Sequence, residues 1–172
     1  MSPTAAPDRT EAAPYYFTYI DKVPQGDIRH LLETQLPEAV ALLSDISEDR
    51  SRHRYAPGKW SIREVLHHLN DTERLFVFRA LWFARGFNSA LPSFDQDVAV
   101  AAGHADRRAW QDLLAEFKVV RAASLAFYRS LPDDAWARTG IASGNPFTVR
   151  ALACCTVGHV AHHLKVLREK YL

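Results

Sequence analysis

Apolar residues recur every three or four positions in four long segments of this chain, a spacing that places them on one face of an α-helix. The first predicted helix begins after a capping residue, Asp27, and ends at about Ser47. The second begins at a capping box formed by Ser61 and Glu64 and ends just before Gly86. Each helix has an apolar stripe and a polar face, so both are expected to pack against other helices.

The other two periodic segments lie in the second half of the chain. One is expected to begin at a capping residue, Asp106, and to end before Pro132. The other runs from about Thr148 to about Lys170. Four amphipathic helices predict an all-α fold, a four-helix bundle. The aromatic segment 15–23 precedes the first helix and is expected to lie extended across the surface of the bundle.

Two long connections interrupt the predicted bundle, at residues 87–104 and 132–147. Connections of this length act as crossovers and carry function more often than short loops do. Residues 15–172 are therefore expected to form a single bundle domain with long crossover connections. Residues 1–14 contain three prolines and no apolar run, and they are expected to form a disordered leader.

The composition is that of an ordinary globular domain, with 48% hydrophobic and 24% charged residues in a chain of 172. Because 21 basic residues nearly balance 20 acidic ones, we expect no nucleic-acid partner. No apolar stretch approaches the roughly 20 residues of a membrane span, so no membrane partner is expected. Cys154 and Cys155 are adjacent, which disfavours a disulfide and predicts reduced thiols in a cytoplasmic protein.

Histidine spacing is the strongest chemical signal in the sequence. Five of the eight histidines lie in the segments 60–73 and 158–164. His159 and His163 are four residues apart on the fourth predicted helix, so their rings lie on one face about one turn apart. Helical projection places both rings among the core-facing residues. A divalent cation would satisfy both lone pairs at once, so the pair predicts metal binding.

A third imidazole from the second predicted helix would complete the site. Projection of that helix places His68 at the margin of the apolar stripe and His67 farther toward solvent, so His68 is the expected third ligand. The alternative is a set of core histidines satisfied by neighbouring groups, or surface histidines that happen to cluster. Cys155 lies one turn before His159 and is either a fourth ligand or a small buried apolar residue.

Two carboxylates are candidate catalytic residues. Glu73 falls inside the apolar stripe of the second predicted helix, where an unpaired charge is rare. It would act as a general base or accept a hydrogen bond from a ligand histidine; an equal alternative is a buried ion pair with Arg79, Arg121 or Arg150. Asp95, on the first long connection, is positioned to close over an open coordination position.

The segments Trp60–Asp71 and Gly158–His163 together resemble the histidine motifs of the DinB-like superfamily, which includes damage-inducible proteins and metalloproteins of the bacillithiol S-transferase type. The pair Phe94-Asp95 is similar to a loop motif of that family. The resemblance covers residues from about Tyr15 to the end of the chain. It implies a four-helix bundle with long crossovers and a divalent ion, zinc or nickel.

Carried onto this sequence, the resemblance implies that the metal ligands are His68, His159 and His163. These are the same three histidines that the helical projections select. At the position of Glu73 the family can have another histidine, and this departure leaves the substrate class open. Some members of the family resemble enzymes that bind a low-molecular-weight thiol at the metal.

These observations predict a metal-dependent enzyme whose three neutral imidazoles leave coordination positions open. Such a site activates a low-molecular-weight thiol, as in an S-transferase, or water, as in a hydrolase. The alternative is a non-catalytic, stress-related metal-binding protein whose ion only stabilises the bundle. Aromatic residues between Phe76 and Phe87 exceed what one helix face can bury, so a homodimer is expected unless residues 15–19 cover them.

Overall fold

Four long helices form the body of the molecule in the computed structural model, which describes residues 6–172. Within that range the elements are the helices α1 (Phe17–Ile20), α2 (Ile28–Ser44), α3 (Ile62–Ala84), α4 (Gln96–Gly103), α5 (Trp110–Arg129) and α6 (Val149–Lys170), the strands β1 (Thr139–Ala142) and β2 (Asn145–Thr148), and short 3₁₀ helices at Pro14–Tyr16, Arg50–Arg52, Ala105–Arg107 and Asp133–Ala137. Helices α2, α3, α5 and α6 pack together as the expected four-helix bundle.

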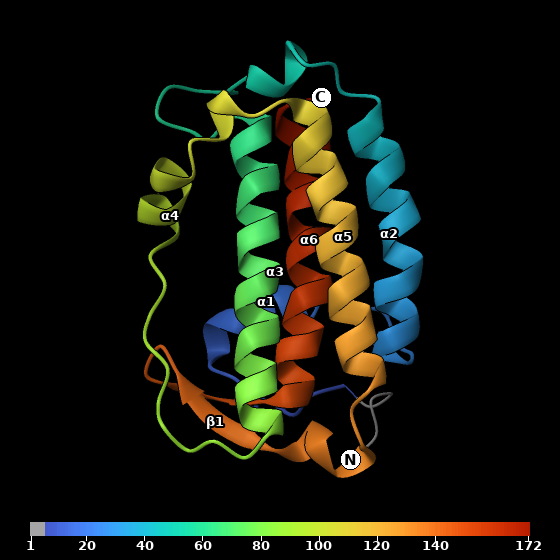
Figure 1. The fold of residues 1–172 in the computed structure, drawn as a ribbon, viewed down its shortest axis with the longest axis vertical. Coiled ribbons are helices and arrows are strands. Elements are labelled where there is room, and N and C mark those ends of the chain that lie inside the picture. Colours follow the sequence, from blue (N-terminus) through green and yellow to red (C-terminus); the bar gives the residue numbers. More distant parts are fainter. Residues whose placement is uncertain (1–5) are drawn as a thin grey trace.

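The direction of the helices explains the first long connection, residues 87–104, whereas the second, residues 132–147, joins the antiparallel helices α5 and α6 and is not the crossover that its length predicts (Figure 1). Helices α2 and α6 run one way along the bundle, and α3 and α5 run the other way (Figure 1). Because α3 and α5 are parallel, the chain between them returns along the length of the bundle. That crossover carries α4, which lies beside α3 (Figure 1).

Three of the predicted helix starts are confirmed by their capping hydrogen bonds. The Asp27 carboxylate accepts from the backbone N–H of Arg29, and the Thr148 hydroxyl accepts from that of Ala151. At the start of α3, Ser61 and Glu64 form both hydrogen bonds of a capping box. Each cap satisfies backbone donors that the first helical turn leaves free.

The predicted start of the third helix is wrong. Asp106 lies in a 3₁₀ helix, and α5 begins only at Trp110, after Ala109. The backbone N–H of Trp110 donates to the Glu48 carboxylate over 2.7 Å. A residue from the α2–α3 connection therefore performs the capping that the local sequence assigns to Asp106.

The prediction that the segment 15–23 is extended is also wrong. Its first part forms two short helices. The 3₁₀ turn Pro14–Tyr16 runs directly into α1, which buries Phe17 and Ile20. Helix α1 packs against α6 at Gly158, where an added Cβ would lie only 2.1 Å from the carbonyl oxygen of Tyr19. The short helix thus lies over α6 because a glycine allows the two backbones to approach closely.

Both long connections contain regular structure that the sequence pattern did not predict. The first holds α4, whose start is capped by the Asp95 carboxylate through the N–H groups of Asp97 and Val98. The second holds the antiparallel pair β1 and β2, in which Thr139 pairs with Thr148. This hairpin lies at the end of the bundle where α3 stops and α6 begins (Figure 1).

The expected disordered leader, residues 1–14, falls partly outside the described residues, which begin at residue 6. Within the described part, Glu11 is buried and pairs with Arg150 of α6. Its carboxylate also accepts from the Thr148 hydroxyl over 2.7 Å. The residues around Glu11 are therefore anchored to the start of α6, since a carboxylate buried there needs these partners.

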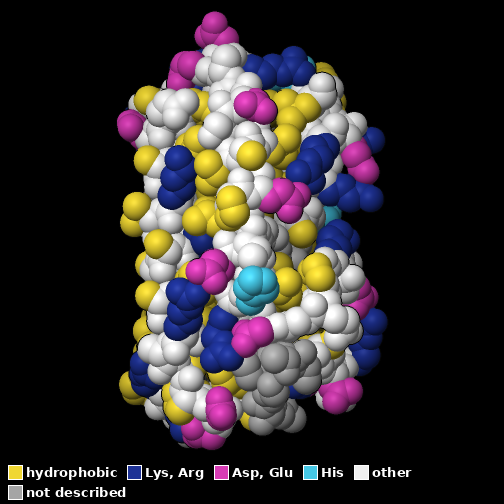
Figure 2. Space-filling view, turned by 90° about the vertical axis from the view of Figure 1, so that its right-hand side faces the viewer, with side chains coloured by type: hydrophobic (Ala, Val, Ile, Leu, Met, Phe, Trp, Pro, Cys, Tyr) yellow, Lys and Arg dark blue, Asp and Glu magenta, His cyan; other side chains and the backbone are white. Residues whose placement is uncertain are grey.

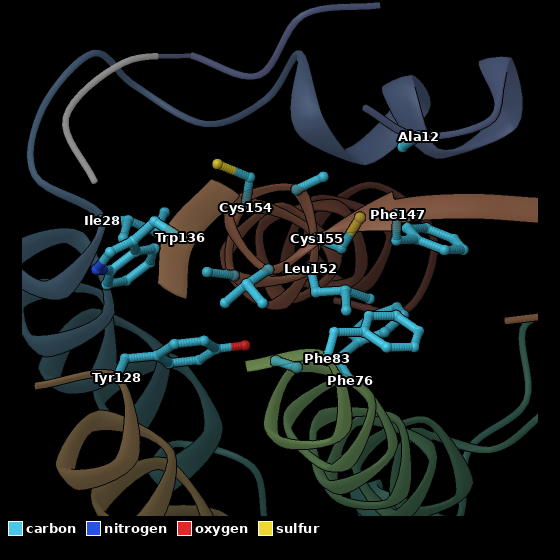
Figure 3. Packing of buried hydrophobic residues seen from close by; sticks show 14 of the residues in the cluster. Ala12, Ile28, Phe76, Phe83, Tyr128, Trp136, Phe147, Leu152, Cys154 and Cys155 are labelled. Carbon is cyan, nitrogen blue, oxygen red and sulfur yellow. The ribbon is translucent and has the colours of Figure 1, made fainter. Parts of the chain in front are cut away.

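The apolar core has two parts. Figure 3 shows one of them, built around residues from α3, α5, α6 and the hairpin region: Phe76, Phe83, Tyr128, Trp136, Phe147, Leu152, Cys154 and Cys155. The other gathers around Trp110 toward the far end of the bundle. Along α6, His159 lies between Val157 of the first cluster and Val160 of the second. The candidate site thus occupies a polar layer between two apolar clusters.

The face presented by α2 carries side chains of both signs, scattered rather than gathered into one patch (Figure 2). This distribution agrees with the near balance of basic and acidic residues in the sequence. Among residues 6–172, none of the helices has the length and apolar content needed to cross a membrane.

Candidate metal centre

Three histidines from two helices converge inside the bundle. His68 of α3 and His159 and His163 of α6 each offer a ring nitrogen, and these nitrogens lie within 4.8 Å of one another. The Nε2 atom of His159 is 3.1 Å from Nε2 of His68 and 3.1 Å from Nε2 of His163. His68 and His159 are buried and His163 is partly buried.

Burial keeps all three rings uncharged at neutral pH. Loss of solvent, together with the nearby His67, lowers the pKa of His68 to about 4. Burial, and then the neighbouring imidazoles, lower the pKa of His163 to about 3 and that of His159 well below its usual value. A neutral imidazole has one nitrogen with a free lone pair, which is the form that binds a metal ion.

Neighbouring side chains fix the orientation of the rings. The Thr72 hydroxyl, one turn after His68, lies 3.3 Å from Nδ1 of that ring. Trp60 packs on the other side of His68, and Tyr19 of α1 meets the His159 ring edge-on. With Nδ1 of His68 held by a hydroxyl, its Nε2 faces the other two histidines, as in sites where a hydrogen bond sets the tautomer of a ligand.

The spacing of the nitrogens fits a single ion. Two nitrogens bound at 2.0–2.1 Å to a tetrahedral zinc ion lie about 3.3 Å apart. The two short separations in the cluster are both 3.1 Å. In the tautomer in which all three Nε2 atoms are unprotonated, they are three acceptors that repel one another, and a cation satisfies all three at once. The donor set therefore suits a divalent metal ion.

The cluster adjoins two cavities. One, of about 240 Å³, has His68 and His159 in its wall, and is otherwise lined by Tyr15, Tyr16, Tyr19, Thr72, Leu75, Phe76, Arg79, Phe94, Gln96 and Ser143. The other, of about 380 Å³, has His163 in its wall together with Trp60, His162 and Tyr171. Gln96, at the start of α4, lines both. A molecule in either cavity would be next to the imidazole nitrogens.

The sequence model of the DinB superfamily matches residues 31–167, which is most of the chain. This chain belongs to the DinB superfamily. The matched residues of this DinB-superfamily chain include all three clustered histidines, His68, His159 and His163. A comparison with curated proteins gives no match.

The DinB-superfamily bundle is also similar to a solved structure. YfiT from Bacillus subtilis, described as a probable metal-dependent hydrolase with an unusual four-helix bundle topology, superposes with a TM-score of 0.69 at 20% sequence identity. The match covers 82% of this chain and 84% of YfiT. At this identity the likeness establishes a shared fold.

Glu73 forms a buried ion pair with Arg121. Its two carboxylate oxygens each accept a hydrogen bond from Arg121 over 2.8 Å, and both side chains are at most 2% exposed. Of the two alternatives drawn from the sequence, the structure therefore displays the buried ion pair. Among the described residues, no hydrogen bond joins Glu73 to the histidine cluster, and a direct catalytic role for it stays a prediction.

The other predicted site residues lie at varying distance from the cluster. Asp95 is exposed and caps α4, while its neighbours Phe94 and Gln96 reach the first cavity. Cys155 is buried in the apolar core, where burial raises the pKa of its thiol. It is absent from the ligand group that the described residues form, and it is thus the small buried apolar residue of the second interpretation.

The prediction that His67 is exposed is wrong. The residue is 7% exposed, and its Nε2 lies 3.2 Å from the Asp71 carboxylate in a geometry that makes no regular hydrogen bond. Helix α4 covers it at Gly103, where an added Cβ would lie 1.9 Å from the same nitrogen. A projection of α3 alone could not show this cover, because α4 returns from the crossover.

Sequence reasoning missed the rest of the cavity wall. Tyr16, Tyr19 and Ser143 come from the N-terminal segment and the hairpin, far from the histidine motifs in sequence. Arg79 carried a usable signal, because it lies eleven residues after His68, about three helical turns, and so on the same face of α3. That face also includes Thr72 and continues along the cavity.

Proposed function

We propose that His68, His159 and His163 bind a divalent cation, zinc or nickel, and that the protein is a metal-dependent enzyme acting on a small molecule in the adjoining cavities. The observation that carries this proposal is the convergence of three neutral imidazoles, with Nε2 of His159 3.1 Å from Nε2 of both His68 and His163 and all three ligand nitrogens within 4.8 Å of one another. The description of YfiT as a probable metal-dependent hydrolase supports it at the level of the shared fold.

When bound, such an ion supplies a Lewis acid that makes water or a thiol nucleophilic near neutral pH. The protein's own residues perform the remaining tasks. The three imidazoles accept no proton at neutral pH, because burial holds their pKa values low. The tyrosine hydroxyls of the first cavity offer hydrogen bonds to a small ligand, and Phe76 adds an apolar surface beside the His159 ring.

The nucleophile to be activated is water, giving a hydrolase, or a low-molecular-weight thiol, giving an S-transferase. No thiol of the described residues is available at the site, since Cys154 and Cys155 are buried in the core and burial raises the pKa of Cys154 to about 12. A thiol nucleophile would therefore come from a small molecule. Hydrolysis of ester and amide panels, compared with conjugation of a thiol to 1-chloro-2,4-dinitrobenzene, distinguishes the two reactions.

The decisive experiment measures the metal. We expect the wild-type protein to carry about one zinc or nickel ion per chain, and His159→Ala and His163→Ala to lose at least nine-tenths of it in elemental analysis, because two imidazoles hold an ion far less tightly than three. His30→Ala, an exposed histidine of α2, is the matched control and should keep the metal. Full metal retention in both cluster variants would refute the site.

The alternative is an ion that only stabilises the bundle. The cluster links α3 to α6, so a metal bound there would hold the two helices together. Circular dichroism after chelation separates the two cases, since removal of a purely structural ion should melt the bundle. We propose instead that the metal-free protein keeps its helices, because two apolar clusters flank the polar layer.

We further propose that the protein acts in the cytoplasm as a homodimer. Its two adjacent cysteines are free, which suits a reducing compartment. Phe78, in the second half of α3, and Phe87, just after that helix, are 47% and 50% exposed, so residues 15–19 do not cover them. Apolar side chains exposed together in this way are typical of a contact surface.

A further inference from the structure

The first cavity contains a charged side chain that the metal proposal does not use. Arg79 of α3 lines this cavity together with His68 and His159 and is only 2% exposed. Arginine stays protonated at neutral pH even where burial lowers its pKa, as it does here. The cavity wall thus carries a permanent positive charge removed from solvent.

Buried arginines elsewhere in the bundle are neutralised by an acid. Counting Arg79, the buried arginines among the described residues are Arg63, Arg79, Arg121 and Arg150. Three of them form ion pairs: Glu48–Arg63, Glu73–Arg121 and Glu11–Arg150. Among residues 6–172 no carboxylate pairs with Arg79, and residues 1–5, Met-Ser-Pro-Thr-Ala, contain no acid. A charge buried without a partner is costly, so an anion from outside the chain would relieve that cost.

Hydrogen bonds to the protein hold the Arg79 side chain in place but do not use all of its N–H donors. Its Nη2 donates to the Pro92 carbonyl oxygen over 3.0 Å and to the Ser143 hydroxyl over 2.9 Å. Its Nε is buried and finds no acceptor within the described part of the chain. One edge of the guanidinium is therefore anchored by the crossover and the hairpin, and donor capacity remains for a ligand.

The position of Arg79 relative to the histidines sets the shape of such a ligand. Eleven residues of helix separate Arg79 from His68, which is about 16 Å of rise before the side chains extend into the cavity. Thr72 and Phe76 lie on the wall between them. A ligand that touches both ends is therefore elongated, with an acidic group at one end and an apolar or aromatic body.

We propose that Arg79 binds the carboxylate of the substrate, while the reacting end of the same molecule lies at the three-histidine cluster. This inference rests on the proposed metal-dependent function and specifies its substrate class as organic carboxylates. The permanent charge of the guanidinium offsets that of a carboxylate, and its Nε–H, which has no acceptor among the described residues, can donate to a carboxylate oxygen. The aromatic wall formed by Tyr16 and Phe76 suits an apolar body between the two ends.

Calorimetric titration with benzoate and with its uncharged analogue benzamide tests the inference, on both the metal-loaded and the metal-free protein. We expect the metal-free wild type to bind benzoate at least tenfold more tightly than benzamide. Arg79→Gln should lose this preference and keep its metal content. Arg85→Gln, which removes an exposed arginine of the same helix end, should leave the preference unchanged. Equal affinities of the wild type for the two ligands overturn the inference whatever the variants show.

A second measurement needs no variant. Phenylglyoxal modifies arginine, and peptide mapping reports the modified positions. Benzoate should protect Arg79 and leave Arg85 reactive, and failure of benzoate to protect Arg79 counts against the inference even if Arg79→Gln does not fold. The two proposals fail separately: a chain that binds no metal but shows Arg79-dependent benzoate binding loses only the metal function. A metal-loaded chain without that dependence loses only the carboxylate site.

Discussion

Glu73 and Arg121 form an ion pair inside the bundle, with a hydrogen bond to each carboxylate oxygen. Arg121 also donates to the Leu32 carbonyl oxygen over 3.1 Å and to the Gln35 side chain over 2.9 Å. The pair therefore joins α3, α5 and α2 within the polar layer. Since both charges are removed from water, each depends on the other far more than a surface pair would.

We expect Glu73→Gln to lower the free energy of unfolding by about 3–5 kcal/mol, because it leaves the Arg121 charge buried without a counter-charge. Urea unfolding followed by circular dichroism measures this change. The matched control is Glu33→Gln, which breaks an ion pair with Arg129 in which both side chains are about half exposed and should cost less than about 1 kcal/mol. Unchanged stability with lost turnover in Glu73→Gln would instead assign Glu73 a catalytic role.

At this scale the sequence predicted which residues were unusual better than it predicted their partners. The apolar stripe of the second helix singled out Glu73 and left three arginines as candidates. Only the packing of α5 against α3 selects Arg121. In the same way, helical projection of α3 placed His68 in the cluster correctly but placed His67 in solvent. His67 is buried because another helix, α4, covers it, and a projection of α3 alone does not include α4.

Among the elements that supply none of the clustered histidines, α1 contacts the site directly. It consists of four residues, yet it supplies Tyr19 to the cavity and packs that ring against His159. Its position depends on Gly158, one residue before that histidine in α6. The glycine in the histidine motif, Gly158, therefore allows the backbone of α1 to pack closely against α6.

Gly158→Ala should displace α1 from α6, since the new methyl group would lie 2.1 Å from a backbone oxygen that cannot turn away. We expect a loss of about 1–3 kcal/mol in the free energy of unfolding, typical of overpacking. Hydrogen exchange should show faster exchange in residues 17–20, with the amides of α5 as the internal control. Unchanged exchange in residues 17–20 would mean that α1 does not depend on this contact.

Helix boundaries were predictable where the capping chemistry is local. Asp27, Ser61 and Thr148 each cap the helix that follows them directly in sequence. The start of α5 was not predictable, because its first N–H group donates to Glu48, which lies in a distant part of the chain. Helices α1 and α4 were missed because four and eight residues are too few for a periodic pattern to stand out.

For the whole molecule, the parallel direction of α3 and α5 has the widest effect. It forces the crossover that brings α4 over the outer side of α3 and so shapes both cavities (Figure 1). The sequence predicted that the connections were long. It predicted both as crossovers, whereas only this one returns along the bundle, since the direction of each helix depends on how the helices pack.

The exposed end of α3 gives a prediction about assembly. Light scattering after gel filtration should give a mass twice that of one chain, because Phe78 and Phe87 are exposed together. The double variant Phe78→Ser with Phe87→Ser should give the mass of a single chain. Val119→Ser, at an exposed apolar position of α5, should leave the dimer intact. A wild-type mass equal to one chain would rule out the dimer.

The histidine cluster stands between two cavities, with His68 and His159 in the wall of one and His163 in the wall of the other. Gln96 lines both cavities, so the two cavities adjoin at this residue. Two small molecules, one in each cavity, would therefore contact different histidines of the same cluster. A reaction between two substrates here would pass through a ternary complex, with neither product leaving before the second substrate arrives.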